Sequence, residues 1–294
     1  MAATIACIAG EEVHRQWDAR RIGGERLGPR PTPFGDSGEI FLVTENGRSF
    51  YLLPRYGAGL RKTAPRRVND RANLYALKDL GVQAVLAWGP GGAITHTIAV
   101  GDLVVLDDLI DRTYLRSKTF FEDSPLGFLR QFPVFCPSLR RVVSEVLHEM
   151  KLVYHGAGTA AVCEGPRLET PAEVRVLGAL GAEVVTHSFV PEVFLAKELQ
   201  LCYAAVCYVV NYAETGSRHR PFAAGELFGG LTQESDSDRL AGAVGAMSRI
   251  VSNVAEAAER QQRVDCDCGA TMAHHVRQYD LPDDWRQWFG WRGL

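Results

Sequence analysis

Short apolar runs alternate with stretches whose apolar residues recur at helical spacing. Two apolar runs around the turn signal Glu45-Asn46-Gly47 predict a β-hairpin over residues 39–57. Helical spacing predicts helices at residues 71–81, 138–152, 170–181, 190–201 and, as one long terminal helix, 235–262. Buried strands are predicted at residues 4–8, 83–88, 101–110, 158–166, 183–188 and 203–214, the second of them breaking into a Gly-Pro-Gly-Gly loop.

Strands separated by helices predict an α/β fold, with a central, mainly parallel or mixed β-sheet covered by helices on both faces. No internal repeat or low-complexity linker interrupts the pattern, so we expect a single domain. In such a sheet, ligands collect where strands end in loops at the carboxyl edge. Six post-strand stretches are therefore expected to converge on one site: IAGEE, LPRYGAG, AWGPGGA, CEGPRLET, THSFVPE and VVNYAETG.

Composition excludes several classes of function. Charged residues make up 23% of the 294 residues, apolar residues 46%, and the formal net charge is −3. This balance gives no reason to expect a nucleic acid or an anionic membrane as a partner. We find neither a signal-peptide pattern nor an apolar segment near 18 residues, and we expect a cytoplasmic protein without a membrane span.

The seven cysteines fit a reducing compartment. Cys7, Cys136, Cys163, Cys202 and Cys207 are scattered singly and are interpreted as buried thiols. Cys266 and Cys268 form a C-x-C pair, for which a zinc site would need two more ligands, and His274 and His275 are the near candidates in sequence. We expect no metal here and interpret the pair as redox-active or simply exposed.

Several segments, in order and spacing, resemble the purine nucleoside phosphorylase and methylthioadenosine phosphorylase family. They are RVNDRANLYALKDLG, VGDLVVLDDLIDRT, FCPSLR, EGPRLETPAEVRVLGALGAEVV and VPEVFLAKELQLCYA. The resemblance runs from about Thr4 to about Cys268 and implies the nucleoside phosphorylase fold, a homotrimer, and cleavage of a purine nucleoside by phosphate. It implies no cofactor, with inorganic phosphate as a candidate co-substrate. The C-x-C pair resembles a feature of some thermophilic members, where it is linked to stability.

Glycosidic cleavage passes through an oxocarbenium-like sugar, so the enzyme must stabilise negative charge on the departing purine. The resemblance places Asn211 beside the purine N7 and O6 edge, and Glu169 where members acting on 6-oxopurines accept a hydrogen bond from N1–H. Adenine-specific members tend to carry serine at the position of Glu169 and aspartate at that of Asn211. Without the resemblance, Glu169 would be interpreted as a carboxylate at a helix N-terminus, and Asn211 as part of a turn at the end of a strand. Pro90, Gly91 and Leu168 are the other predicted base-binding residues.

On the sugar side, His187 stands where the family usually carries methionine, and His219 belongs to a segment that should border the 5′ end. An imidazole there could hydrogen-bond a hydroxyl or a 5′ substituent, or simply pack. Arg218, His219 and Arg220 could meet an acidic 5′ group, although such a run is often an exposed basic loop.

The predicted nucleophile site departs from the family pattern. Its expected residues are Gly10, Arg55, Tyr56, Gly89 and Ser188. Of the family's phosphate ligands, Arg55 and Ser188 are retained, whereas Glu11 replaces a Ser or Thr and Tyr56 replaces a histidine. Gly89 and Pro90 occupy the middle loop, and proline has no N–H to donate.

Glu11 would repel a bound phosphate dianion and could pair with Arg55 instead. Three outcomes stay open: phosphate binds in a shifted pose, Glu11 holds a water that hydrolyses the bond, or the fold binds a nucleoside without catalysis. Glu11 and Glu12 could also simply begin a helix. The sequence thus supports an enzyme, with Asn211, Glu169 and Glu11 as its candidate catalytic residues, and leaves a non-catalytic nucleoside-binding protein as the alternative.

The chain is predicted to consist of a nucleoside phosphorylase-like domain over residues 1–270 and a C-terminal extension over residues 271–294. This extension contains PDDWRQWFGWRGL, which is rich in tryptophan and lies beyond the resemblance. It is expected to dock on its own domain or to cover a neighbouring subunit.

Overall fold

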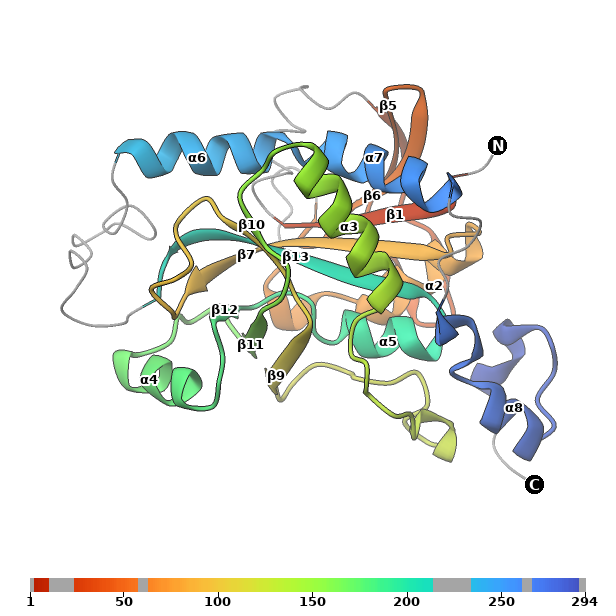
Figure 1. Cartoon of the computed structure of the whole chain (residues 1–294). Coiled ribbons are helices and arrows are strands. Elements are labelled where there is room, and N and C mark those ends of the chain that lie inside the picture. The colour runs from red at the N-terminus through yellow and green to blue at the C-terminus, as the bar shows by residue number, and fades with distance from the viewer. Residues whose placement is uncertain (1–2, 11–23, 58–62, 214–233, 261–265, 291–294) are drawn as a thin grey trace.

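The computed structural model describes residues 3–10, 24–57, 63–213, 234–260 and 266–290 (Figure 1). A mixed sheet of 11 strands runs in the order β10-β8-β13-β7-β1-β6-β5-β2, with β9, β11 and β12 branching from it. Its strands are β1 (Ile5–Ala9), β2 (Gly24–Gly28), β5 (Ile40–Glu45), β6 (Arg48–Pro54), β7 (Ala84–Ala93), β8 (Leu103–Val105), β9 (Asp108–Arg112), β10 (Tyr154–His155), β11 (Thr159–Cys163), β12 (Val184–Thr186) and β13 (Cys202–Tyr212). Two short strands, β3 (Pro31–Thr32) and β4 (Gly35–Asp36), pair separately.

The centre of the sheet is parallel, because β1 pairs in parallel with β6 and β7, and β7 pairs in parallel with β13. The predicted hairpin is formed by β5 and β6, and its turn residues Asn46 and Gly47 have φ values of 51° and 76°. Positive φ at both positions suits Asn-Gly. The carboxyl ends of β1, β6, β7 and β13 therefore meet at one edge of the sheet.

Helices cover both faces of the sheet, which confirms the α/β expectation (Figure 1). One core joins α2 and α5 to alternate strand residues such as Ile8, and the other joins α3 and α7 to their neighbours such as Cys7. The α-helices are α2 (Asp70–Asp79), α3 (Pro137–Glu149), α4 (Pro171–Ala179), α5 (Glu192–Glu198), α6 (Glu234–Gly245), α7 (Met247–Arg260) and α8 (Ala273–Gln278). The 3₁₀ helices are η1 (Pro65–Arg67), η2 (Pro125–Gly127), η4 (Asp267–Ala270) and η5 (Trp285–Gly290).

The predicted Gly-Pro-Gly-Gly loop is wrong, because β7 continues through these residues to Ala93. Pairing with β13 on one side and with β12 on the other extends the strand beyond Trp88. The glycines allow close approach of neighbouring residues: a Cβ on Gly91 would lie 2.4 Å from the Cys207 sulfur. Glycine in a strand often marks such close packing.

The predicted single helix over residues 235–262 is also wrong. The structure breaks it at Ala246 into α6 and α7. Gly242 and Gly245 precede the break, and glycine lowers helix propensity by about 1 kcal/mol relative to alanine. The break allows α6 to pack on β13 while α7 packs on α3 and the β5/β6 hairpin.

The C-terminal segment packs on its own chain as far as it is described. The ring of Trp285 lies 4.9 Å from that of Tyr75 in α2, and the ring of Phe289 lies 5.3 Å from that of Phe34. The Trp288 indole N–H donates to the Pro282 carbonyl at 2.7 Å. Whether residues 271–294 form a separate extension stays a prediction.

The surroundings of the C-x-C pair differ from the expectation. Cys136 and Cys202, interpreted from the sequence as isolated buried thiols, meet Cys266 and Cys268, whereas His274 and His275 are not part of this group. Distance along the chain misled the prediction, because folding brings the residue before α3 and the first residue of β13 to η4.

None of the described helices is both long and apolar enough to cross a membrane.

Candidate functional site

The ends of β1 and β6 meet the middle of β7 around Gly10, which follows β1. Its N–H donates to the Trp88 carbonyl of β7 at 2.8 Å, and the Arg55 N–H, after β6, donates to the Ala9 carbonyl at 2.8 Å. A Cβ on Gly10 would lie 2.8 Å from Pro90 Cδ, so a larger residue would push these strands apart. Three of the six predicted stretches therefore converge.

The stretch after β12 joins this group. The hydroxyl groups of Tyr56 and Ser188 lie 3.1 Å apart, and the Thr186 hydroxyl donates to the Pro90 carbonyl at 2.6 Å. A Cβ on Gly89 would lie 2.9 Å from Ser188 Oγ, which explains the need for glycine there. Tyr56 and Ser188 are thus brought together, as the prediction of a common nucleophile site requires.

Asn211 lies within β13, directly after a register shift between Val209 and Asn211. It is therefore not part of a strand-end turn. Its side chain is buried, and a Cβ on Gly92 would lie 2.9 Å from Asn211 Oδ1. The glycine in β7 thus leaves room for the amide beside the strand.

Glu169 lies close to His187, with 3.2 Å between Oε1 and Nε2. Burial acts to raise the pKa of Glu169, but the hydrogen bond and charge of His187 outweigh it and lower the pKa below its ordinary value. The carboxyl group is therefore ionised at neutral pH. Glu169 does not cap α4, because Thr170 and Glu173 form the capping box of that helix.

The remaining predicted residues are less informative. Leu168 is 40% exposed, and its carbonyl accepts a hydrogen bond from Arg167. Glu11, Glu12 and the Arg218-His219-Arg220 run lie outside the described residues.

Arg55 is buried and heavily bonded. Its Nε donates to Glu192, its Nη2 donates to Glu192 at 3.1 Å and to the Ile8 carbonyl at 3.2 Å, and its Nη1 donates to the Trp88 carbonyl at 3.0 Å. Tyr203 donates its hydroxyl to Glu192 at 2.8 Å. Burial acts to lower the pKa of Arg55, but Glu192 raises it overall, so the guanidinium stays charged. A guanidinium has five N–H groups, and these bonds use four of them.

Sequence reasoning missed two charged residues of this region. Glu192 is the carboxylate partner of Arg55, the role considered for Glu11. Arg116 donates to the carbonyls of Cys163, Glu164, His187 and Val190 and to the Glu164 carboxylate, which uses all five of its N–H groups. Arg116 thereby ties together the loops that carry Glu169 and Ser188. Glu192 could have been found from the sequence because it belongs to the Val-Pro-Glu motif, whereas Arg116 lies in none of the motifs.

The arrangement offers distinct chemistry at its two sides. Glu169 and His187 present an ionised carboxylate and an imidazole, and Asn211 presents a side-chain amide beside Gly92 of β7. Such groups can accept and donate hydrogen bonds to a heterocycle. The predicted nucleophile site presents two hydroxyl groups beside an arginine that is already paired.

Comparison with known proteins places this geometry in a family. The model of the phosphorylase superfamily matches residues 61–260. Over 216 residues, the chain is 37% identical to a probable 6-oxopurine nucleoside phosphorylase of Thermococcus kodakarensis, covering 71% of this chain and 79% of that protein. Over 210 residues, it is 37% identical to a probable S-methyl-5′-thioinosine phosphorylase of Methanothermobacter thermautotrophicus, covering 71% of each chain.

A solved structure shares the fold. The methylthioadenosine phosphorylase from an antarctic soil metagenomic library aligns with a TM-score of 0.77 at 23% identity, covering 93% of this chain and 92% of that chain. Fold, motifs and relatives agree, and the chain belongs to the phosphorylase superfamily.

Proposed function

We propose that this protein cleaves the N-glycosidic bond of 6-oxopurine nucleosides, 5′-methylthio forms included, with inorganic phosphate as the nucleophile. A phosphate oxygen bonds to C1′ as the C1′–N9 bond breaks, and that electron pair moves onto the purine. The products are the free base and a ribose 1-phosphate derivative. Relatives that are 37% identical carry the names of 6-oxopurine and methylthioinosine phosphorylases, which supports this choice.

The observation that carries the proposal is the ionised Glu169 held by His187. A carboxylate can accept a hydrogen bond from N1–H of a 6-oxopurine, whereas N1 of adenine is itself an acceptor. Leaving that mismatch buried costs about 1–3 kcal/mol. The site therefore favours hypoxanthine- or guanine-type bases.

Asn211 is the residue that we expect to stabilise the leaving group. Its amide can donate to the N7 edge, where negative charge develops as the bond breaks. Pro90, Gly91 and Leu168 would border the base, and His187 and His219 the sugar. We place the nucleophile between Gly10, Gly89 and the Tyr56 and Ser188 hydroxyls.

Hydrolysis is the second candidate, favoured by the bonding of Arg55. Four of its five donors already have partners within the protein, so little of the guanidinium is left for a phosphate dianion. For hydrolysis, we propose that Glu11 takes a proton from a water molecule, which attacks C1′ in place of phosphate. The products are then the free base and free ribose.

We also propose that the protein acts as a homotrimer in the cytoplasm. Between residues 113 and 135, four large apolar side chains are mostly exposed: Tyr114, Leu115, Phe128 and Phe132. Exposed apolar patches often mark contact surfaces. Size-exclusion chromatography with light scattering tests this, since a trimeric mass is expected and a monomeric mass would contradict it.

Release of free base tests the proposed function. Inosine, guanosine and 5′-methylthioinosine should yield base in phosphate buffer, and adenosine should react about 10–100-fold more slowly, in line with 1–3 kcal/mol. The variant Glu169→Ser/Asn211→Asp carries the residue pair of adenine-specific members. It should reduce the difference in rate between inosine and adenosine. No release from any of these nucleosides, with phosphate or with water, would leave a protein that only binds nucleosides.

A further inference from the structure

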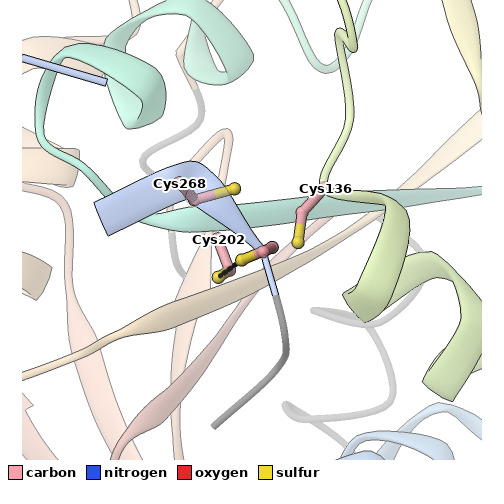
Figure 2. Close-up of side chains that lie close together, drawn as sticks. Cys136, Cys202 and Cys268 are labelled. Carbon is pink, nitrogen blue, oxygen red and sulfur yellow. Dashed lines mark hydrogen bonds between the residues drawn. The ribbon is translucent and has the colours of Figure 1, made fainter. Parts of the chain in front are cut away.

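Four cysteine side chains gather where β13 begins. The sulfurs of Cys136, Cys202, Cys266 and Cys268 all lie within 4.8 Å of one another, and those of Cys202 and Cys266 are 3.4 Å apart. Figure 2 shows three of these residues meeting from three elements, with Cys136 at the start of α3, Cys202 on β13 and Cys268 on η4. All four are free thiols.

This geometry matches a tetrahedral metal site. Zinc binds thiolate sulfur at about 2.3 Å, which sets the edge of a regular tetrahedron at about 3.8 Å. No two of the four sulfurs are more than 4.8 Å apart, and the 3.4 Å between Cys202 and Cys266 is close to this edge, whereas disulfide-bonded sulfurs lie about 2.05 Å apart. We propose that Cys136, Cys202, Cys266 and Cys268 bind one Zn²⁺ ion.

The surroundings suit the charge of such a site. Four thiolates around Zn²⁺ leave a net charge of −2, which needs nearby donors and cations. The Leu139 N–H, in the first turn of α3, donates to Cys136 Sγ at 3.4 Å, and the positive end of this 13-residue helix faces the same sulfur.

Lys197 places a positive charge near the cluster. It lines one pocket together with Cys136, Cys268 and Thr271. Its ammonium group donates to the Pro133 carbonyl at 2.7 Å, which holds it on this side of the site.

The site would be structural. All four coordination positions are filled by protein sulfur, which leaves none open for water or substrate. Cys202 and Asn211 are nine residues apart on β13, roughly 30 Å along a strand, so the ion is remote from the candidate site. It would fasten η4, and with it the segment that leads to α8 and η5, to the sheet and to α3.

Metal analysis of the full-length protein tests the proposal. The protein is produced with added zinc and purified without chelator, and zinc is measured by mass spectrometry. We expect about one zinc per chain in the wild type and in the control Cys7→Ala, whose thiol lies in the core beside Met247. The variant Cys136→Ser/Cys202→Ser should retain less than about a tenth of that amount.

Spectroscopy keeps the proposal testable if the double variant does not fold. After replacement of zinc by Co²⁺, wild-type protein should show the strong visible bands of tetrahedral cobalt and the near-ultraviolet bands of thiolate-to-cobalt charge transfer. Four alkylatable thiols with no bound metal would overturn the proposal. So would disulfides among the four cysteines in the denatured, unreduced protein, or full zinc content in the folded double variant.

Discussion

The two sides of the candidate site differ in how their charged groups are used. On the proposed base side, Glu169 contacts His187, with 3.2 Å between Oε1 and Nε2, and an ionised carboxylate has further acceptor positions for a ligand. On the nucleophile side, Arg55 spends most of its donors on Glu192 and on backbone carbonyls. The base side is thus equipped to recognise a ligand, whereas the arginine of the nucleophile side mainly holds strands together.

Because of this difference, the identity of the base and the identity of the nucleophile have to be considered separately. In the proposed function, the choice of base depends on Glu169 and Asn211. The choice of nucleophile depends on the groups that are available near Tyr56 and Ser188. Arg55 is buried and paired with Glu192, whose carboxylate also accepts a hydrogen bond from Tyr203, so its first role is structural.

The largest expected effect is on stability, through the buried pair of Arg55 and Glu192. Glu192→Leu leaves the guanidinium charged and unpaired, so the free energy of unfolding should fall by about 3–5 kcal/mol. Urea denaturation measures this. The double variant Arg55→Met/Glu192→Leu should lose less than the sum of the single losses. An Arg55→Met variant of unchanged stability would show that Arg55 serves the ligand alone.

Removal of the leaving-group donor should have the next largest effect. Asn211→Ala is expected to lower kcat for inosine by about 10²–10³, the usual cost of losing one donor to a developing charge. Steady-state kinetics measures it, with the melting temperature as a check on folding. Asn253→Ala, in α7, is the matched control and should keep its activity. A twofold loss in Asn211→Ala would contradict the assigned role.

A smaller effect is expected for base recognition. Glu169→Gln removes the ionised acceptor for N1–H, so kcat/KM for inosine should fall by about 10–100-fold, and that for adenosine should fall less. The control is Glu173→Gln, which changes a nearby carboxylate of the capping box. Equal losses for both nucleosides would mean that Glu169 does not read the base.

The smallest effect concerns pH. His187 lowers the pKa of Glu169, so the pair contributes stability above the ordinary carboxyl pKa of about 4.5, and that stability is lost as pH falls through the lowered value. In His187→Met the pKa of Glu169 rises, and the acid limb of kcat/KM for inosine should move to higher pH. At pH 7, above that limb, kcat/KM for inosine should change less than it does at acid pH. An unmoved acid limb would contradict this coupling.

Much of the fold could be predicted from local patterns. Apolar runs and helical spacing identified the strands at the centre of the sheet and helices on both of its faces, because burial of one face repeats with the period of each element. The errors fell where tertiary contacts override local preference. Pairing with β13 holds Gly-Pro-Gly-Gly in β7, and packing of α6 and α7 on different partners breaks the terminal helix.

Less of the site could be predicted. Asn211, Glu169, His187 and Ser188 could be proposed as site residues because their motifs match in order and spacing, and their roles stay predictions. The pairing of Glu192 with Arg55 and the five hydrogen bonds of Arg116 could not be predicted. The sequence does not show which side chains meet across the fold. The same limit hid Cys136 and Cys202 as neighbours of the C-x-C pair.

The dependence of hypoxanthine release on phosphate tests the central claim most directly. The rate from inosine is measured in phosphate-free buffer and again as phosphate rises to millimolar concentration. The account predicts release that requires phosphate, saturates with it and yields ribose 1-phosphate. Equal release without phosphate, with free ribose as the product, would contradict phosphorolysis and identify water as the nucleophile.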